Sequence, residues 1–293
     1  MVLEHIIPEK WLEKRAWSAF LLGGFYSFIG IIIARFLFAA DPALPAVAFT
    51  SLFILPELYT LFKIEEEEQE NDSGSDIRAF WKDNGDFFRV MLGIFLGILL
   101  VYSLAAMVLP SFSVNSLFRE QLAMRSGGFG AAGMATTGAA IQSDGLFIRL
   151  LLNNAMVLAA VFVVAFLAGD GAIFLLTWNA SVWGTIFGVT ARNAAIVTQG
   201  DPFTYFMIIV FTVTPHVLLE GSSYILAAMA GGLISRAILK DGFGTKRFNE
   251  ALQDNATIIG LAILCLVIGV LVETYVLQNS DSYADIIRLS LRA

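Results

Sequence analysis

Long apolar runs, each followed by a short polar segment, are the feature that most constrains this chain. A helix of about 20 apolar residues crosses the hydrocarbon core of a bilayer, because each residue adds about 1.5 Å. Hydrophobic residues make up 57% of the 293 residues and charged residues only 15%, against about 25% charged in soluble domains. One soluble core could not bury that much apolar surface. The sequence therefore predicts an all-α, polytopic bundle of transmembrane helices.

We expect about seven of these runs to cross the membrane. They are residues 17–38, 47–62, 87–109, 147–168, 171–189, 215–238 and 256–276. The second run is the shortest and contains Pro56 and Glu57, so a re-entrant or interfacial segment is the alternative there. A single helix over residues 203–239 would be over about 50 Å long. We therefore expect a break at Thr214–Pro215, which would leave residues 203–213 as a re-entrant or interfacial half-helix.

Polar segments divide the chain into three regions. Residues 1–86 form an N-terminal region of two spans with an acidic loop over 63–86. Residues 87–146 hold the third span, a short interfacial helix over 116–124 and a connection over 126–140 that is rich in Gly, Ala and Thr and is either flexible or re-entrant. Residues 147–293 hold four spans and a short polar tail. Lys and Arg are more numerous on the side of the N-terminus, which predicts a cytoplasmic N-terminus and acidic loop if residues 47–62 cross.

Several classes of function find no support in the sequence. The net charge of −7 gives no basis for nucleic-acid binding, and the single cysteine, Cys265, excludes a disulfide or thiolate metal cluster within one chain. His-Glu-x-x-His, Gly-x-Ser-x-Gly and Walker motifs are missing, and the chain has only two histidines. We therefore expect a protein that is not an enzyme, with no catalytic residues, no metal and no cofactor.

Polar side chains inside the predicted spans are the candidate functional residues, because such groups are expensive in lipid. They are Arg149, Asn153 and Asn154 in the fourth span, Asn179 in the fifth, and His216 and Glu220 in the sixth. Arg149 and Asn153 are i,i+4 neighbours on one helix face, as are His216 and Glu220. Counting residues from the span ends places Asn153 and Glu220 roughly 8–9 Å below the same membrane surface, with Asn179 deeper. We predict a polar cluster at this level, with Arg149 above it.

This predicted cluster has a structural and two functional interpretations. Amides and carboxylates in spans often only connect neighbouring helices by hydrogen bonds. The alternatives for His216 and Glu220 are a site for a proton, an ion or a polar head group, and a docking site for a partner. The spacings of Gly93 with Gly97 and of Gly184 with Gly188 favour close helix packing, either within the chain or in a homodimer.

The same residues fall within motifs that resemble a known family. The motifs are Leu-Leu-Asn-Asn-Ala at 151–155, Gly-Asp-Gly at 169–171, Thr-Trp-Asn-Ala-Ser-Val-Trp-Gly at 177–184, Thr-Pro-His-Val-Leu-Leu-Glu-Gly at 214–221 and Ala-Gly-Gly at 230–232. Their order and spacing resemble the stage II sporulation protein M family, and the first three spans with the acidic loop resemble its archaeal branch. Val217 departs from the family pattern, which often has Gly there. The resemblance implies that the positions Asn154, Asn179, Pro215, His216 and Glu220 are important, but implies no reaction.

The resemblance implies a multi-pass protein of the cell membrane that acts as a non-enzymatic scaffold or envelope-remodelling component. The family's namesake scaffolds peptidoglycan hydrolases during engulfment, and archaeal relatives have neither spores nor murein. The expected partners are the lipid bilayer, a membrane or envelope protein and a second copy of the chain, and no nucleic acid. The expected break at Pro215 beside polar groups favours an alternative, a transporter or channel for a proton, an ion or a small polar solute. An intramembrane hydrolase that uses His216 is a more distant third hypothesis.

Overall fold

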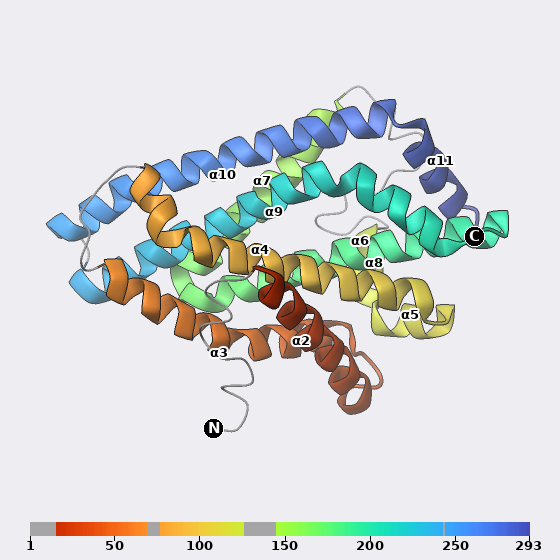
Figure 1. Ribbon diagram of the computed structural model, residues 1–293, viewed down its shortest axis with the longest axis horizontal. Helices are drawn as coiled ribbons and strands as arrows, with labels where there is room; N and C mark the ends of the chain where they lie inside the picture. The colour runs from red at the N-terminus through yellow and green to blue at the C-terminus, as the bar shows by residue number, and fades with distance from the viewer. Residues whose placement is uncertain (1–15, 70–76, 126–144, 243) are drawn as a thin grey trace.

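The computed structural model describes residues 16–69, 77–125, 145–242 and 244–293, and within these ranges it contains helices and no strand. The long helices are α2 (Ala16–Leu37), α3 (Ala43–Gln69), α4 (Ile77–Val108), α7 (Leu146–Ala168), α8 (Ala172–Thr198), α9 (Pro202–Asp241) and α10 (Lys246–Asn279). The short ones are α5 (Ser111–Leu117), α6 (Arg119–Arg125), the 3-10 turn η2 (Gly169–Gly171) and α11 (Asp281–Ser290). Figure 1 shows the long helices gathered into one bundle. The predicted all-α class is confirmed.

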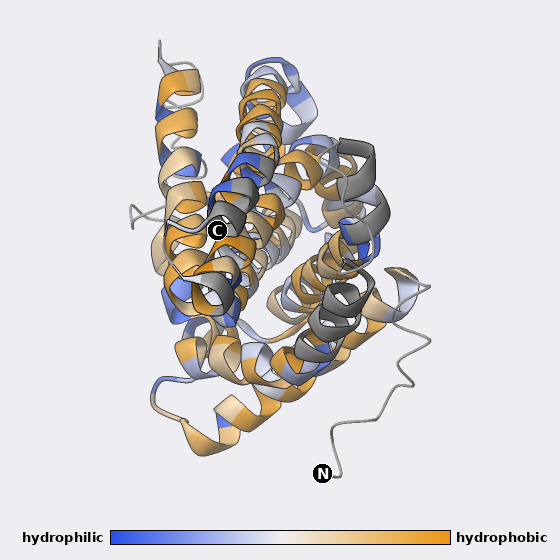
Figure 2. Ribbon diagram, turned by 90° about the vertical axis from the view of Figure 1, so that its left-hand side faces the viewer, coloured by the Kyte–Doolittle hydropathy of each residue, from blue (hydrophilic) through white to orange (hydrophobic). Residues whose placement is uncertain are grey.

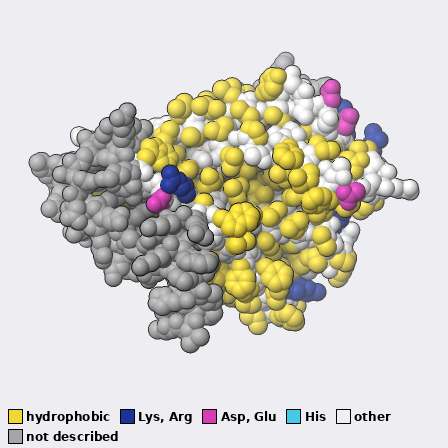
Figure 3. Space-filling view, in the orientation of Figure 1, with side chains coloured by type: hydrophobic (Ala, Val, Ile, Leu, Met, Phe, Trp, Pro, Cys, Tyr) yellow, Lys and Arg dark blue, Asp and Glu magenta, His cyan; other side chains and the backbone are white. Residues whose placement is uncertain are grey.

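The surface of this bundle is apolar over most of its length. Large apolar side chains such as Trp17, Phe36 and Phe211 are exposed. Figure 2 shows helices that are hydrophobic along much of their length, and Figure 3 shows apolar side chains across the middle of one face with charged side chains near its margins. A surface of this kind is expected where lipid rather than water surrounds the helices.

Five stretches of the described chain are long and apolar enough to cross a membrane, so the expected count of about seven spans is not confirmed. They are Ala16–Leu37, Asn84–Val108, Leu146–Thr198, Pro202–Leu239 and Asn255–Asn279. The apolar part of α3, Ala43–Leu58, is shorter than a span, although α3 itself continues to Gln69. The stretch Leu146–Thr198 contains both α7 and α8, because only the turn η2 separates them. At about 1.5 Å per residue, α7 and α8 are each long enough to cross by themselves.

The predicted break at Thr214–Pro215 is wrong, because α9 is one helix of 40 residues with Pro215 inside it. Proline has no N–H to donate to the carbonyl four residues before it, which weakens the helix at this point. The Thr214 hydroxyl donates to the Val210 carbonyl oxygen at 2.5 Å, a contact that bends helices without ending them. Figure 1 shows α9 bending along its course. Residues 203–213 therefore belong to α9 and do not form a separate half-helix.

Three other expected segments differ from the structure. Much of the expected acidic loop over 63–86 is helical, since α3 extends to Gln69 and α4 begins at Ile77. The expected interfacial helix over 116–124 is divided between α5 and α6, and the polar tail forms α11. The Gly-rich connection over 126–140 lies outside the described residues.

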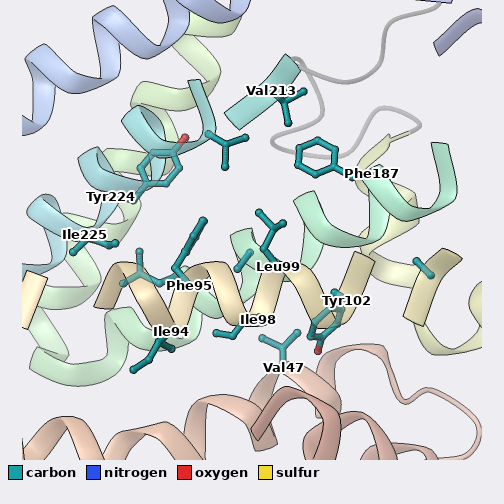
Figure 4. Packing of buried hydrophobic residues seen from close by; sticks show 14 of the residues in the cluster. Val47, Ile94, Phe95, Ile98, Leu99, Tyr102, Phe187, Val213, Tyr224 and Ile225 are labelled. Carbon is teal, nitrogen blue, oxygen red and sulfur yellow. The ribbon is translucent and has the colours of Figure 1, made fainter. Parts of the chain in front are cut away.

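Helix α4 lies at the centre of the bundle and contacts α2 and α8. Glycines allow these backbones to touch: a Cβ added at Gly97 would meet the Phe20 carbonyl oxygen of α2, and one at Gly184 would meet the Leu99 carbonyl oxygen of α4. Figure 4 shows side chains of α4 between α3 on one side and α9 on the other. Both glycine spacings seen in the sequence therefore serve contacts within the chain.

The C-terminal helices form the other part of the bundle. Helix α9 packs along α10 and α7, and α11 packs on α8 near the end where α7 and α9 begin. Apolar residues Tyr283, Ile286 and Ile287 of α11 are buried. The Asn193 side chain of α8 donates to the Ser290 carbonyl oxygen at 3.3 Å. These contacts hold α11 across one end of the C-terminal helices.

Candidate functional site: a polar cavity between the C-terminal helices

A cavity of about 240 Å³ lies between α7, α8, α9, α10 and α11. This volume is far above what a single water molecule needs, so the cavity has room for a small solute. The polar residues of its wall are Asn153 and Asn154 of α7, Asn179 and Thr190 of α8, His216, Glu220 and Tyr224 of α9, Glu273 of α10 and Tyr283 of α11. Most of the remaining wall is aliphatic or aromatic.

Polar side chains follow one another along the cavity wall from α7 to α10. The Asn153 Nδ2 atom donates to Asn154 Oδ1 at 3.0 Å, and Asn154, Glu220 and Glu273 line the same cavity. Two ionised carboxyl groups buried close together are costly, because they repel each other and have lost their contact with water. We therefore expect at least one of the two glutamates to carry a proton.

Burial of this pair is nearly complete and its hydrogen bonding is incomplete. The exposed fraction is 3% for Glu220 and 8% for Glu273. Among the described residues, Glu220 Oε1, Glu273 Oε2 and His216 Nδ1 have no hydrogen-bond partner. A buried polar atom without a partner lowers stability by about 1–3 kcal/mol. All three atoms belong to residues of the cavity wall.

The local sequence makes room for the carboxyl pair. Gly269 of α10 lies one helical turn before Glu273, and a Cβ at Gly269 would lie 2.9 Å from Glu220 Cγ. A larger residue at this position would push α10 away from α9. Gly269 therefore permits the close approach that brings the two carboxyl groups together.

The structure brings together five of the residues singled out from the sequence and leaves two apart. Asn153, Asn154, Asn179, His216 and Glu220 all line the cavity. Asn179 was expected to lie deeper than the others, yet it shares their cavity. The depth assigned to Glu220 assumed a span that begins at Pro215, whereas α9 begins at Pro202. The Asn179 amide also donates to the Leu175 carbonyl oxygen of its own helix at 2.8 Å.

Arg149 and Pro215 are exposed and do not belong to the cavity wall. Arg149 lies in the first turn of α7, where a long basic side chain can extend toward the membrane surface rather than into the bundle. Pro215 contributes to the site only through the bend that it introduces one residue before His216.

Sequence reasoning missed Glu273 and the aromatic wall. Glu273 is a carboxyl group inside the predicted span 256–276, so the rule that identified Glu220 applies to it equally. It was overlooked because it lies near the end of that span. Tyr224 follows Glu220 by one helical turn, and its ring centroid lies 6.1 Å from that of Trp183, which also lines the cavity.

Comparison with protein families identifies the chain as a whole. A model of the family described as Stage II sporulation protein M matches residues 20–277. The chain belongs to this family. The resemblance drawn from residues 151–232 is confirmed, and the match extends it over α2, α3 and α4 as well as most of α10. Comparisons with curated proteins and with solved structures found no match.

Family membership and the five long apolar stretches together make this a multi-pass membrane protein. Chemically, the cavity of this family member combines two buried carboxyl groups with amides and an imidazole. Within the described ranges, no three His, Cys, Asp or Glu side chains are placed to hold a metal ion. The wall is therefore suited to a proton, a monovalent cation or a solute that donates hydrogen bonds.

Proposed function

We propose that this Stage II sporulation protein M family member is a non-enzymatic membrane protein that binds a proton, an ion or a small polar solute in the cavity and moves it across the membrane. The observation that carries the proposal is the cavity itself, in whose wall two buried carboxyl groups each keep an oxygen without a partner among the described residues. A purely structural cluster would pair these atoms and leave no space between the helices. The bend of α9 beside His216 adds support, because transporters often bind substrate where a helix is interrupted.

Flux measurements on the full chain in liposomes test this proposal. Under imposed pH and ion gradients, an internal pH dye should report flux through the wild-type protein and little or none through Glu220→Gln. Glu57→Gln is the matched control, because Glu57 is a buried acid of α3 that lies outside the cavity. Absence of any flux above that of empty liposomes, or equal flux in wild type and Glu220→Gln, would contradict the proposal.

The proposed orientation places the N-terminus in the cytoplasm and α11 on the outside. Ser282 is an exposed residue of α11, and Cys265 is the single cysteine. A Cys265→Ala, Ser282→Cys variant should react with a membrane-impermeant maleimide added to intact cells. Labelling that requires permeabilised cells would reverse the orientation.

A scaffold role is the second candidate, and one exposed aromatic residue favours it. Phe112 of α5 is 82% exposed and lies outside the five membrane-spanning stretches. An aromatic side chain in this position fits a docking contact with a membrane or envelope protein, or with a second copy of the chain. A photo-crosslinker at position 112 should then yield one defined adduct in native membranes. Adducts with lipid alone would remove this support.

A further inference from the structure

We propose that the solute bound in the cavity is a small organic cation of the primary alkylammonium type, which enters in exchange for a proton held by Glu220 or Glu273. This inference rests on the proposed function and names the substrate class of the same site. Its basis is the charge of the cavity, the chemistry of its wall and the position of the aromatic rings.

Among the described residues, the cavity wall contains two glutamates and the imidazole of His216, but no Lys or Arg side chain. Arg149 is exposed. The Arg192 side chain of α8 is engaged elsewhere, because its Nη1 atom donates to the carbonyl oxygens of Ala106 at 3.3 Å and Leu109 at 3.2 Å. Two carboxyl groups buried without a cation from the protein attract a cation from outside.

The rest of the wall favours an organic cation over a metal ion. No set of three metal-ligating side chains is available in the described part of the chain. Val157, Val161 and Leu277 offer aliphatic surface, which binds an alkyl chain but does not coordinate a metal. An alkylammonium ion presents both kinds of surface, with N–H donors at one end for the carboxyl oxygens and methylene groups at the other.

Two tryptophans of α8, Trp178 and Trp183, complete the case for a cation. Indole faces attract ammonium groups, and most strongly where water is excluded. Trp183 is held by neighbouring rings, since its centroid lies 5.6 Å from that of Phe95 in an edge arrangement and 6.1 Å from that of Tyr224. A fixed indole loses little conformational freedom when a ligand binds against it.

Exchange for a proton follows from the burial of both carboxyl groups, which favours their protonated form while the cavity is empty. The ammonium N–H groups would donate to Glu220 Oε1 and Glu273 Oε2, which have no partner among the described residues. The proton held by one carboxyl group then leaves to water, so the net charge of the site is unchanged. The other titratable groups of the wall are His216 and Tyr224 of α9 and Tyr283 of α11, whereas α7 and α8 contribute none. Because a proton competes with the cation, binding should weaken as pH falls, by up to about tenfold per pH unit for one exchanged proton.

Calorimetry on the purified full chain in lipid nanodiscs tests the inference. The probe is n-butylammonium chloride, compared with 1-butanol and sodium chloride, in two buffers of different ionisation enthalpy. We expect saturable butylammonium binding, release of about one proton, and weaker binding at lower pH. Binding should weaken by about tenfold or more in both Glu220→Gln and Glu273→Gln, which corresponds to about 1.4 kcal/mol, and stay unchanged in the control Glu57→Gln. Helical circular dichroism and a single size-exclusion peak show that each variant is folded.

Several outcomes would overturn the inference, and they separate it from the proposed function. Equal binding of 1-butanol would mean a merely apolar pocket, and stronger binding of sodium would mean an inorganic cation. If butylammonium binds without releasing a proton, or binds equally well to both glutamine variants, the cation does not exchange for a carboxyl proton. If butylammonium does not bind while Glu220-dependent flux persists in liposomes, only the substrate class is wrong. If both binding and flux are absent, the proposed function fails as well.

Discussion

The helices around α4 and the helices around α9 bury carboxyl groups in two different ways. Near α4, the hydroxyl groups of Ser27, Thr50 and Ser103 each donate to the carbonyl oxygen four residues earlier in their own helix. Tyr26 Oη donates to the carboxyl group of Glu57 at 3.1 Å. Around α9, Glu220 and Glu273 keep oxygens without a partner among the described residues, and a cavity lies beside them.

This difference indicates that the helices around α4 serve mainly structure and that the helices around α9 serve ligand binding. Touching glycine backbones give α2, α4 and α8 a close fit, which favours a rigid framework, and the buried acid near them, Glu57, accepts a hydrogen bond. Carboxyl oxygens that are buried without a partner lower stability, so a fold retains them where they serve a ligand. Substitutions in the two regions should therefore affect folding very differently, and four of them test that expectation.

The largest effect is expected for Gly97→Leu in the framework. A Cβ at this position meets the Phe20 carbonyl oxygen and lies 2.8 Å from the Gly24 nitrogen, so α2 and α4 would have to separate. We expect a loss of about 3 kcal/mol or more, measured by thermal unfolding in detergent. Gly260→Leu is the control, because no atom lies within 4 Å of a Cβ at Gly260. Equal stability of the two variants would show that the glycine contact does not hold the framework together.

A smaller effect is expected for Tyr26→Phe, which removes the hydrogen bond to Glu57. Glu57 is only 6% exposed, so loss of this donor should lower the free energy of unfolding by about 1–2 kcal/mol. Tyr275→Phe, at a position that is 68% exposed, should leave the unfolding curve unchanged. A Tyr26→Phe variant as stable as wild type would mean that the hydrogen bond to Glu57 does not stabilise the fold. Glu57 would then not differ in this respect from the glutamates of the cavity.

The sequence predicted the framework and much of the site for the same physical reason. Hydropathy identifies helices that lipid must surround, and polar residues inside them are few enough to single out as candidates. Helical rise placed Asn153 and Glu220 at one level, but that estimate assumed a span beginning at Pro215, whereas α9 begins at Pro202. Depth does not say which helix faces meet, so the pairing of Glu220 with Glu273 required the packing of α9 on α10. The continuity of α9 also escaped prediction, because the sequence alone does not say whether a proline ends a membrane helix or lies inside it, where packing against neighbouring helices allows the helix to continue.

The opposite response is expected when both carboxyl groups of the cavity are replaced. Glu220→Met with Glu273→Met substitutes apolar groups of similar size for a buried pair whose hydrogen bonding is incomplete. Replacement of both partners is often neutral or stabilising, so the double variant should match or exceed wild type in thermal stability, by less than about 1 kcal/mol. Flux in liposomes should nevertheless be lost. A strongly destabilised double variant would show that Glu220 and Glu273 have a structural role. The helices around α9 would then depend on buried carboxyl groups for stability, as the helices around α4 do.

The smallest effect is expected at the start of α9, which lies outside the cavity. A substitution there tests the stability of the helix without changing the ligand-binding residues. Asp201 is the N-cap, and its carboxylate accepts hydrogen bonds from the Thr204 backbone N–H at 2.9 Å and from the Thr204 hydroxyl at 2.8 Å. These bonds hold the pKa of Asp201 below its ordinary value. The stabilisation is therefore complete above about pH 4, near the pKa of an unfolded Asp, and is lost as pH falls through the lower folded value. Asp201→Ala should lower the melting temperature slightly at pH 7 and leave flux unchanged, whereas Asp201→Asn, which keeps an acceptor, should lower it less. A loss of flux in Asp201→Ala would mean that the first turns of α9 take part in transport. The functional region would then include this end of the bundle as well as the cavity.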